Sequence, residues 1–414
     1  METYEKYKPS GIDWIGEVPE HWEQCRFKNF IQLITKPSNS LVKIGLENIE
    51  SGSGCFIQTD SEFEGSGVEF LKNDVVYGKL RPYLQKVWLA SFDGNAVGDF
   101  FVFRVKSNSN ATYLKYLLLS DGFTREADGA TFGAKMPRVS SDFIMTLRYF
   151  LPTLAEQEAI AAYLDARCAD IDKVVATQQK RIALLQELKQ SEITQAVTRG
   201  LNPDARMKDS GVEWIGMVPE HWEVKKLKFV VSCNDDVLND RTKDDQIIRY
   251  VEISDVNSIE GITNSTEYEF KKAPSRARRI TKKDDVIVST VRTYLKAIAR
   301  IKEEDLIVST GFAVLRAKNI NPVFLAYSTL SELFIGTVIS ESVGVSYPAI
   351  NSSDIINIKL PVPPSDEQVE IAEHLDRRCG EIDKQIGAVT KQIELLREYK
   401  QALITEVVTG KRRV

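Results

Sequence analysis

The side chains of this sequence that are best suited to chemistry are cations interleaved with tyrosines. The densest run is KKAPSRARRITKK, from Lys271 to Lys283, which holds seven Lys or Arg in thirteen positions. Two shorter stretches, GKLRPYLQK from Gly78 and STVRTYLKAIAR from Ser289, combine Arg and Lys with Tyr. Such mixtures suit contacts with the phosphates and base edges of nucleic acids. Each run taken alone is equally compatible with a solvated loop.

The sequence contains only incomplete versions of known catalytic motifs. YGKL and TGKRR lack the upstream Gly and the following Ser or Thr of a phosphate-binding loop, and PVPPS does not replace the [Asp/Asn]-Pro-Pro-[Tyr/Phe] tetrad of an adenine methyltransferase. The three histidines, His21, His221 and His374, have no Ser, Cys or carboxylate at a suggestive spacing. We therefore expect recognition and assembly, without catalytic residues or metal. An enzyme with an unrecognised site and a helical adaptor without a DNA role are the alternatives.

The composition is that of an ordinary folded protein. The chain has 414 residues, a formal net charge of -5 and five cysteines without a CxxC pair. Free thiols are expected, and the negative charge requires any DNA-binding surface to be local. Neither a signal peptide nor an apolar stretch of roughly 18 residues is present, so we expect a cytoplasmic location without membrane contact.

The sequence around these residues is a tandem duplication. The peptide SGIDWIGEVPEHWE, Ser10 to Glu23, returns as SGVEWIGMVPEHWE, Ser210 to Glu223, with three changes. The segment that starts at Ala155 aligns without a gap to the segment that starts at Asp366, at an offset of 211. The intervening stretch is variable and eleven residues longer in the second copy. A motif, a variable domain and a long helix therefore occur twice.

This duplication predicts five parts. In chain order they are the motif with the first variable domain, 1–152; a long helix, 153–199; a linker, 200–209; the repeated motif with the second variable domain, 210–363; and a second long helix, 364–410. Both variable domains mix short β-type runs with an apolar helical run, so the fold class expected for each is α+β. Ser365 and Gln368 fit a capping box at the start of the second helix.

Both long helices carry a heptad seam, which is clean in the second and weakened by Gln178 and Glu192 in the first. Because tandem halves can be related by a pseudo-twofold axis, we expect the helices to form an antiparallel coiled coil. Cys168 and Cys379 would then lie at opposite ends. The 27 residues from Ile171 to Val197 span about 40 Å, which is one turn of DNA or somewhat more. The expected pairing residues are Ile171, Val175, Ile182, Leu185, Ile382, Ile386, Val389, Ile393, Leu396 and Leu403.

The combination of repeated motifs resembles a known family. The WIGxVPEHW peptide, the RPYL-type strand and the EQ..I...LD......ID helix, all in two copies, resemble the specificity subunit of a type I restriction-modification system over essentially the whole chain. The resemblance implies two pseudo-twofold-related target recognition domains separated by the antiparallel helices. Each domain would read one half of a bipartite, asymmetric site in double-stranded DNA with a fixed gap. The helices would dock two adenine methyltransferase subunits, which recruit restriction subunits; S-adenosylmethionine, ATP and Mg are expected on those partners only.

Four of the five tryptophans, Trp14, Trp22, Trp214 and Trp222, belong to the repeated peptide. Two large aromatics with an Ile and a Val in nine residues are costly to leave in water, so each copy is expected to lie against something larger. We favour a role in pinning each variable domain to the helices. A contact with the methyltransferase is the alternative, because exposed aromatics mark interfaces.

A comparison of the two variable domains sorts the residues expected at the DNA. A residue that is identical at matched positions cannot by itself distinguish two different half-sites. Arg81 and Arg292, and Tyr83 and Tyr294, are therefore expected to be scaffold or phosphate contacts. Base readers are expected among nearby residues that differ. They are Lys79, Lys86, Lys135 and Arg138 in the first domain, and Arg276, Arg278, Arg279, Lys296, Ser346 and Tyr347 in the second.

Overall fold

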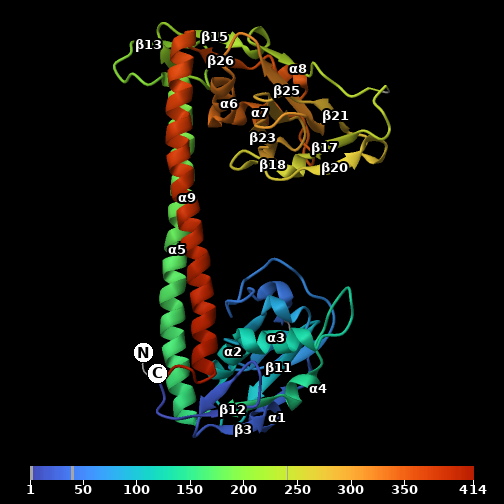
Figure 1. Ribbon diagram of the computed structural model, residues 1–414, viewed down its shortest axis with the longest axis vertical. Helices are drawn as coiled ribbons and strands as arrows, with labels where there is room; N and C mark the ends of the chain where they lie inside the picture. The colour runs from blue at the N-terminus through green and yellow to red at the C-terminus, as the bar shows by residue number, and fades with distance from the viewer. Residues whose placement is uncertain (1–2, 39–41, 240) are drawn as a thin grey trace. The chain divides into compact units, whose positions relative to one another are not determined.

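The computed structural model, which describes residues 3–38, 42–239 and 241–414, divides into two units. Unit 1 comprises Met1–Gln179 with Lys391–Val414, and unit 2 comprises Lys180–Thr390. Each unit therefore contains one copy of the motif, one variable domain, the beginning of one long helix and the end of the other (Figure 1). Both variable domains mix helices and strands, so the α+β class predicted from the sequence is confirmed.

The variable domain of unit 1 is built on two four-stranded sheets. Its first sheet is rich in β-branched and aromatic side chains, which pack well on a pleated surface. This sheet is antiparallel, in the order β4 (Ile31–Ile34), β11 (Phe100–Val105), β8 (Val75–Gly78), β9 (Val87–Leu89). The second has the order β5 (Pro37–Ser38), β7 (Gly67–Phe70), β10 (Gly94–Ala96), β6 (Lys43–Ile44), with β10 and β6 parallel.

Short helices and two-stranded pairs complete this domain. Helix α2 contacts the first sheet, and Ser120 both ends α2 and caps α3 by accepting a hydrogen bond from the Phe123 amide. The pair of β3 and β12 brings the strand at the end of the repeated peptide against the last strand of the domain. The remaining elements are β1 (Tyr7–Pro9), β2 (Glu17–Pro19), β3 (Glu23–Arg26), α1 (Phe27–Phe30), α2 (Ala111–Leu119), α3 (Asp121–Gly129), α4 (Ser141–Thr146) and β12 (Arg148–Leu151).

The variable domain of unit 2 repeats this plan. Its first sheet has the order β16 (Val231–Cys233), β25 (Phe312–Ala317), β22 (Val286–Ser289), β23 (Ile298–Arg300). Its second has the order β20 (Thr266–Glu269), β17 (Ile247–Val251), β24 (Leu306–Ser309), β21 (Ala277–Ile280), with β17 and β24 parallel. In unit 1 the parallel pair lies at the edge of the second sheet, because the sheet ends at β6. In unit 2 a further strand, β20, pairs with β17 beyond the parallel pair. The longer second copy thus carries an added edge strand.

The other elements of unit 2 also have counterparts. Ser331 ends α6 and caps α7 through the Phe334 amide, as Ser120 does between α2 and α3. The elements with counterparts are β13 (Met207–Asp209), β14 (Met217–Pro219), β15 (Glu223–Lys226), α6 (Pro322–Leu330), α7 (Glu332–Ser340), α8 (Ser352–Ile355) and β26 (Lys359–Val362). The hairpin of β18 (Val256–Asn257) and β19 (Gly261–Ile262) stands where unit 1 has a single antiparallel bridge between Ile49 and Phe56.

The two long helices are α5 (Leu154–Arg199) and α9 (Ser365–Val408). At the start of α5 the Thr153 hydroxyl accepts from the Glu156 amide, while the Glu156 carboxylate accepts from the Thr153 amide. The capping box predicted for α9 at Ser365 and Gln368 is wrong, because the Gln368 side chain is used elsewhere. Its amide donates to the Pro363 carbonyl and its oxygen accepts from the Asn321 amide, which ties the helix to the variable domain.

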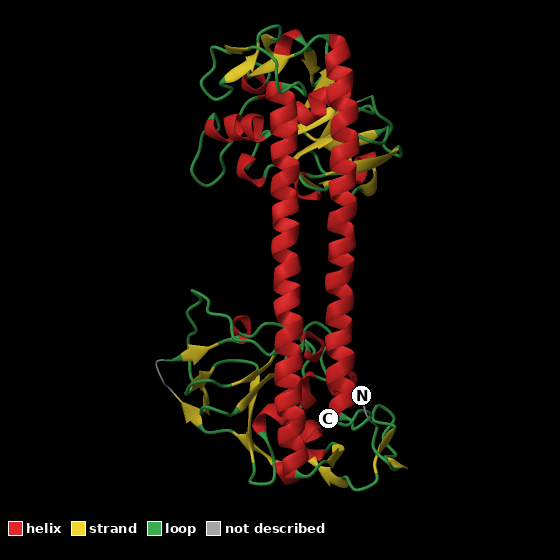
Figure 2. Cartoon of the chain, turned by 90° about the vertical axis from the view of Figure 1, so that its left-hand side faces the viewer, coloured by secondary structure: helices red, strands yellow, loops and turns green. Residues whose placement is uncertain are grey.

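Within each unit the two long helices lie side by side (Figure 2), and the order of the ion pairs between them shows that they run antiparallel. In unit 2, Lys189 on α5 pairs with Asp383 on α9 at 2.7 Å, and Glu192, further along α5, pairs with Arg378, further back on α9, at 2.9 Å. In unit 1, Lys400 on α9 pairs with Asp172 on α5 at 2.7 Å. All ten residues predicted to form the seam are buried or half-buried. The pairing that the heptads predicted is present at both ends of the helices.

The cysteines show the features expected from the composition, and the apolar helices show them only in part. All five cysteines are free, with Cys168 in unit 1 and Cys379 in unit 2. Among the described residues, no single helix is long and apolar enough to cross a membrane, although the bent pair α6 and α7 meets the same criteria of length and composition.

Candidate nucleic-acid interface

Each variable domain carries an unusual turn at its repeated Arg-x-Tyr-Leu sequence. In unit 1, Arg81 and Gln85 have φ angles of 52° and 48° and bracket a 3-10 turn; in unit 2, Arg292 and Lys296 do the same at 50° and 53°. Left-handed backbone at residues other than Gly costs of order 1 kcal/mol each and persists where surrounding contacts hold it. We call Arg81–Gln85 and Arg292–Lys296 the arginine turns.

A second loop packs against each arginine turn. The Arg81 amide donates to the Pro137 carbonyl at 2.8 Å, and the Arg292 amide to the Pro348 carbonyl at 2.7 Å. Each of these loops is closed by a reciprocal pair of backbone hydrogen bonds, between Phe132 and Arg138 and between Val343 and Ala349. We call Phe132–Arg138 and Val343–Ala349 the tip loops. They have equal length, so the two domains share one backbone framework at this surface.

This framework gathers most of the residues predicted to meet DNA. Tyr83 and Tyr294 are 53% and 51% exposed. The guanidinium carbon of Arg292 lies 4.9 Å from the ring centroid of Tyr347, a stacking that holds the cation at the surface. The candidates placed on the arginine turns and tip loops are Arg81, Tyr83, Lys135, Arg138, Arg292, Tyr294, Lys296, Ser346 and Tyr347.

The structure argues against two predicted base readers in unit 1. The Lys86 amine donates to the carbonyls of Leu46 and Ile49 at 2.8 and 2.7 Å, and burial lowers the pKa of Lys86. Arg138 makes a two-pronged ion pair with Asp99, whose hydrogen bonds raise the pKa of Arg138. A base contact by either side chain would first break these bonds. Lys79, at 3.8 Å from Asp99, is less committed and stays a prediction.

The basic run Lys271 to Lys283 is largely occupied by its own domain. Lys271, Lys272 and Lys282 pair with Asp244, Glu269 and Asp236. Among the predicted readers in the run, the Arg278 guanidinium carbon lies 4.9 Å from the Phe270 ring centroid. Arg279 is half-buried, and burial lowers its pKa. The solvated-charge interpretation therefore fits most of this run better, and the exposed Arg276 is the candidate that the structure leaves at the surface.

The sequence analysis missed several exposed apolar residues of the tip loops. Phe132, Met136, Val343 and Val345 all face solvent, whereas an apolar residue in a sequence usually predicts burial. A usable signal was present: matched Gly and Pro residues frame three positions in each copy, and all three differ. Variation inside a fixed framework is what two readers of different sequences require.

The repeated peptide lies between variable domain and long helices in each unit. Trp22 and Trp222 are fully buried. A Cβ added to Gly410, just beyond α9, would come within 3.0 Å of Trp22, and one added to Gly200, just beyond α5, within 3.1 Å of Trp222. This is the arrangement that the pinning hypothesis requires. Burial of these two rings leaves no surface on them for a partner.

The remaining aromatic and histidine residues of the peptide have similar structural partners. Trp14 stacks on Tyr149 at 6.1 Å between centroids, and Trp214 packs on the core of unit 2. His21 and His221 each lie 2.8 Å from a carboxylate oxygen in the first turn of a long helix, Glu156 for the former and Glu367 for the latter. Both histidines therefore have a positioning role. In the described part of the chain, no group of three His, Cys, Asp or Glu could hold a metal ion.

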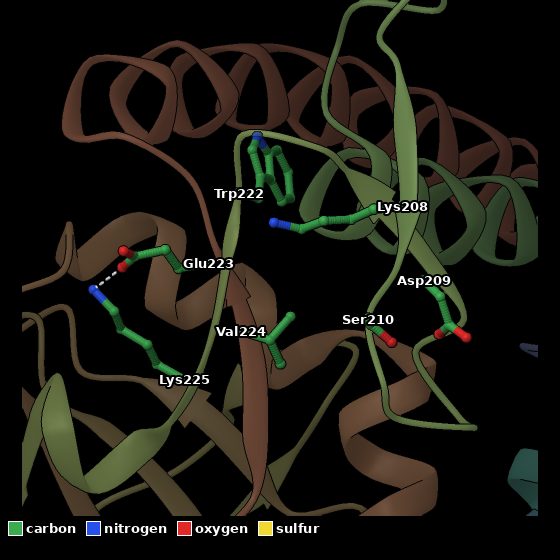
Figure 3. A pocket seen from close by; sticks show the side chains of 7 residues that line it. All are labelled: Lys208, Asp209, Ser210, Trp222, Glu223, Val224 and Lys225. Atoms are coloured by element: carbon green, nitrogen blue, oxygen red, sulfur yellow. Dashed lines mark ion pairs between the residues drawn. The ribbon is translucent and has the colours of Figure 1, made fainter.

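A hollow of about 430 Å³ beside the second copy of the peptide offers no better site (Figure 3). Lys208, Asp209 and Ser210 line one wall, and the segment from Trp222 to Lys225 lines the other. Glu223 forms an ion pair with Lys225, and Figure 3 shows their side chains turned away from those of Asp209 and Ser210. A small-molecule site requires polar groups that converge on one point, and the polar groups of this hollow do not.

Comparison with known proteins gives a consistent result. Residues 219–393 match the family described as the type I restriction modification DNA specificity domain. The chain is 26% identical to the type I restriction enzyme MjaVIII specificity subunit of Methanocaldococcus jannaschii, over 96% of this chain and 94% of the relative. The match extends over both copies of the repeat.

Solved structures share the fold at low sequence identity. A chain from a study of complex assembly and conformational transition in the type I R-M system superposes with a TM-score of 0.71 at 18% identity, covering 94% of this chain and 98% of that one. The HsdS subunit from Thermoanaerobacter tengcongensis gives a TM-score of 0.51 at 19% identity, covering 95% and 98%. These likenesses establish the fold alone.

Substitutions at neighbouring cations separate a DNA contact from a structural one. Arg81→Ala removes an exposed cation, so the slope of log affinity against log salt for double-stranded DNA should fall by about one with unchanged stability. Lys86→Met leaves two carbonyls without their donor, which should lower the free energy of unfolding by about 1–3 kcal/mol and leave the slope unchanged. Anisotropy titrations and denaturation of the full chain measure both effects. A shallower slope for Lys86→Met at normal stability would contradict the assignment.

Proposed function

We propose that the whole chain is the specificity subunit of a type I restriction-modification system, from the premise that residues 219–393 match the DNA specificity domain of that family. It binds double-stranded DNA sequence-specifically. Each unit reads one half of a bipartite, asymmetric target with a fixed gap. The catalytic steps, with their S-adenosylmethionine, ATP and Mg, belong to methyltransferase and restriction partners.

The observation that carries this proposal is the repeated framework with different side chains. Both arginine turns have the same left-handed backbone and are bound to the tip loops by the same Arg-to-Pro hydrogen bond. Within the tip loops, Lys135 and Met136 of unit 1 correspond to Ser346 and Tyr347 of unit 2. Matched residues suit contacts with the uniform phosphate backbone, whereas unmatched residues suit different bases. Two unequal half-sites follow from two unequal readers.

The fixed gap is assigned to the long helices. Each variable domain is fastened to both helices within its own unit. The Tyr116 hydroxyl donates to Asp165 of α5 in unit 1, and the Tyr327 hydroxyl donates to Asp376 of α9 in unit 2. The Gln401 amide donates to the Leu119 carbonyl at 2.5 Å in unit 1, and the Gln190 amide donates to the Leu330 carbonyl at 2.6 Å in unit 2. A reader that is held on a helix cannot slide along DNA independently of its counterpart. We therefore expect a single gap length rather than a range.

The number of methyltransferase subunits is inferred from two matching apolar patches on the helices. Leu184 and Leu188 are exposed on α5 in unit 2, and Leu395 and Tyr399 are exposed on α9 in unit 1. The offset of 211 relates each residue of one pair to a residue of the other. Spaced by one helical turn, each pair presents an apolar strip of the kind that packs against another helix. Two equivalent strips suit two copies of one partner.

The proposal is tested by co-expressing the chain with the methyltransferase subunit of its own system and mapping methylated adenines on genomic DNA. The expected motif has two different half-sites separated by one fixed nonspecific gap. A palindromic or gapless motif would count against two unequal readers. Absence of any chain-dependent motif, together with absence of DNA binding by the complex, would favour the helical adaptor.

The enzyme alternative has its own readout. The purified chain, incubated with DNA and S-adenosylmethionine or with DNA and Mg²⁺, should neither methylate nor cleave, because the sequence carries no adenine methyltransferase tetrad and no group of three His, Cys, Asp or Glu among the described residues could hold a metal ion. Turnover by the chain alone would establish an unrecognised active site and overturn the assignment as a specificity subunit.

Charges in the apolar strips should change the composition of the complex. Leu395→Asp combined with Tyr399→Asp should remove one methyltransferase subunit, and the further changes Leu184→Asp and Leu188→Asp should remove the second, because an aspartate buried at an interface is strongly unfavourable. Val174→Asp is the control, since this exposed residue of α5 has Gln385 as its counterpart. Light scattering of purified complexes measures the stoichiometry. Intact complexes with all four aspartates would place the partners elsewhere.

A further inference from the structure

The tip loops expose apolar side chains that their fold does not need. Phe132 is 61% exposed in unit 1; in unit 2, Val343 is 81% exposed, Val345 is fully exposed and Tyr347 is 65% exposed. Apolar surface left in water forgoes roughly 25 cal/mol per Å² of burial. Single exposed apolar residues are common, but several on one short loop mark a binding surface.

The loop backbone is independent of these side chains. Reciprocal backbone hydrogen bonds close both loops, and Gly133 and Gly344 take the positive φ angles of 91° and 119° that the tight path requires. Between the matched Gly and Pro residues, Ala-Lys-Met in one copy stands where Val-Ser-Tyr stands in the other. The side chains at the tips are therefore free to change without a change of framework.

Cations flank the apolar tips. Exposed Lys135 belongs to the tip loop of unit 1, and Arg81 begins the adjacent arginine turn. In unit 2 the Arg292 guanidinium lies against the ring of Tyr347. An apolar tip bordered by cations is complementary to a DNA groove, where phosphates line the rim and base edges form the floor.

We propose that the tip loops are the base-reading elements and that they read by apolar and aromatic contact, with Met136 and Tyr347 as specificity-determining residues. This inference rests on the proposed function. Apolar side chains recognise the thymine methyl group or enter between base steps, and neither mode needs the hydrogen bonds of a charged reader. The arginine turns then supply phosphate contacts that hold each tip at its base pairs.

An exchange of tip residues tests the proposal in the full chain. The variant Val343→Phe, Val345→Ala, Ser346→Lys and Tyr347→Met gives unit 2 the tip residues of unit 1 on an unchanged backbone path. Ala349 is kept, because its counterpart Arg138 is bound by Asp99. Co-expressed with the methyltransferase subunit, it should methylate a motif that is altered only in the half-site read by unit 2, and the gap and other half-site should be retained. An unaltered motif would overturn the proposal.

A single substitution tests the proposal independently if the exchange variant does not fold. Tyr347→Ala should reduce discrimination at one base pair on the order of 10-fold. Because Arg292 stacks on the Tyr347 ring, affinity for unrelated DNA should fall by no more than it does in Arg292→Ala. The control is Ile259→Ala, because Ile259 is similarly exposed on a different loop of the same domain. Competition binding by the complex, with every single-base variant of the target, measures discrimination. Uniform weakening on all sequences, as a purely structural role would give, contradicts the assignment.

Two other outcomes are distinguishable. If Tyr347→Ala leaves DNA discrimination intact but prevents assembly with the restriction subunit, the tips are a protein-binding surface and the inference fails while the proposed function stands. If the wild-type complex shows no sequence preference at all, the proposed function fails and the inference fails with it.

Discussion

The pairing of the start of one long helix with the end of the other is the interaction on which the rest of the structure depends. In unit 1 the Lys400 amine is buried and pairs with the exposed Asp172, and in unit 2 the half-buried Lys189 pairs with the exposed Asp383. An amine withdrawn from water is costly unless it is paired, so the two lysines favour one register and one orientation of the helices. Each variable domain is then built on helix segments from two distant parts of the sequence.

The same pairing creates the platform on which each variable domain sits. In unit 1 the hydroxyls of Tyr113 and Tyr149 donate to the Val408 carbonyl at the end of α9, which satisfies a terminal helix acceptor within the core. The repeated peptide covers the same end through Trp22. In both units the end of a long helix needs this cover, which explains why the peptide occurs twice in the sequence. The framework is thereby held constant, and the tips remain free to diverge.

Much of this organisation follows from the sequence, because duplication and heptad periodicity report on local structure directly. The seam from Ile171 onward and the mixed class of both domains needed no tertiary information. The assignment of individual cations did need it. Lys86 is satisfied by carbonyls about forty residues earlier in the chain, and Arg138 by Asp99, so their unavailability is a non-local property. The exposure of Val345 is equally invisible in the sequence, since an apolar residue usually predicts burial.

A charge exchange across the helix pair tests the central claim most directly. Asp172→Lys places two cations together and should lower the free energy of unfolding of the full chain by about 1–3 kcal/mol, and Lys400→Asp should also destabilise it. The double variant restores an opposite-charge pair. In thermal and denaturant unfolding it should recover at least half of the summed loss. A double variant as unstable as the sum of the two single changes would show that this contact does not hold the helices together and would contradict the account.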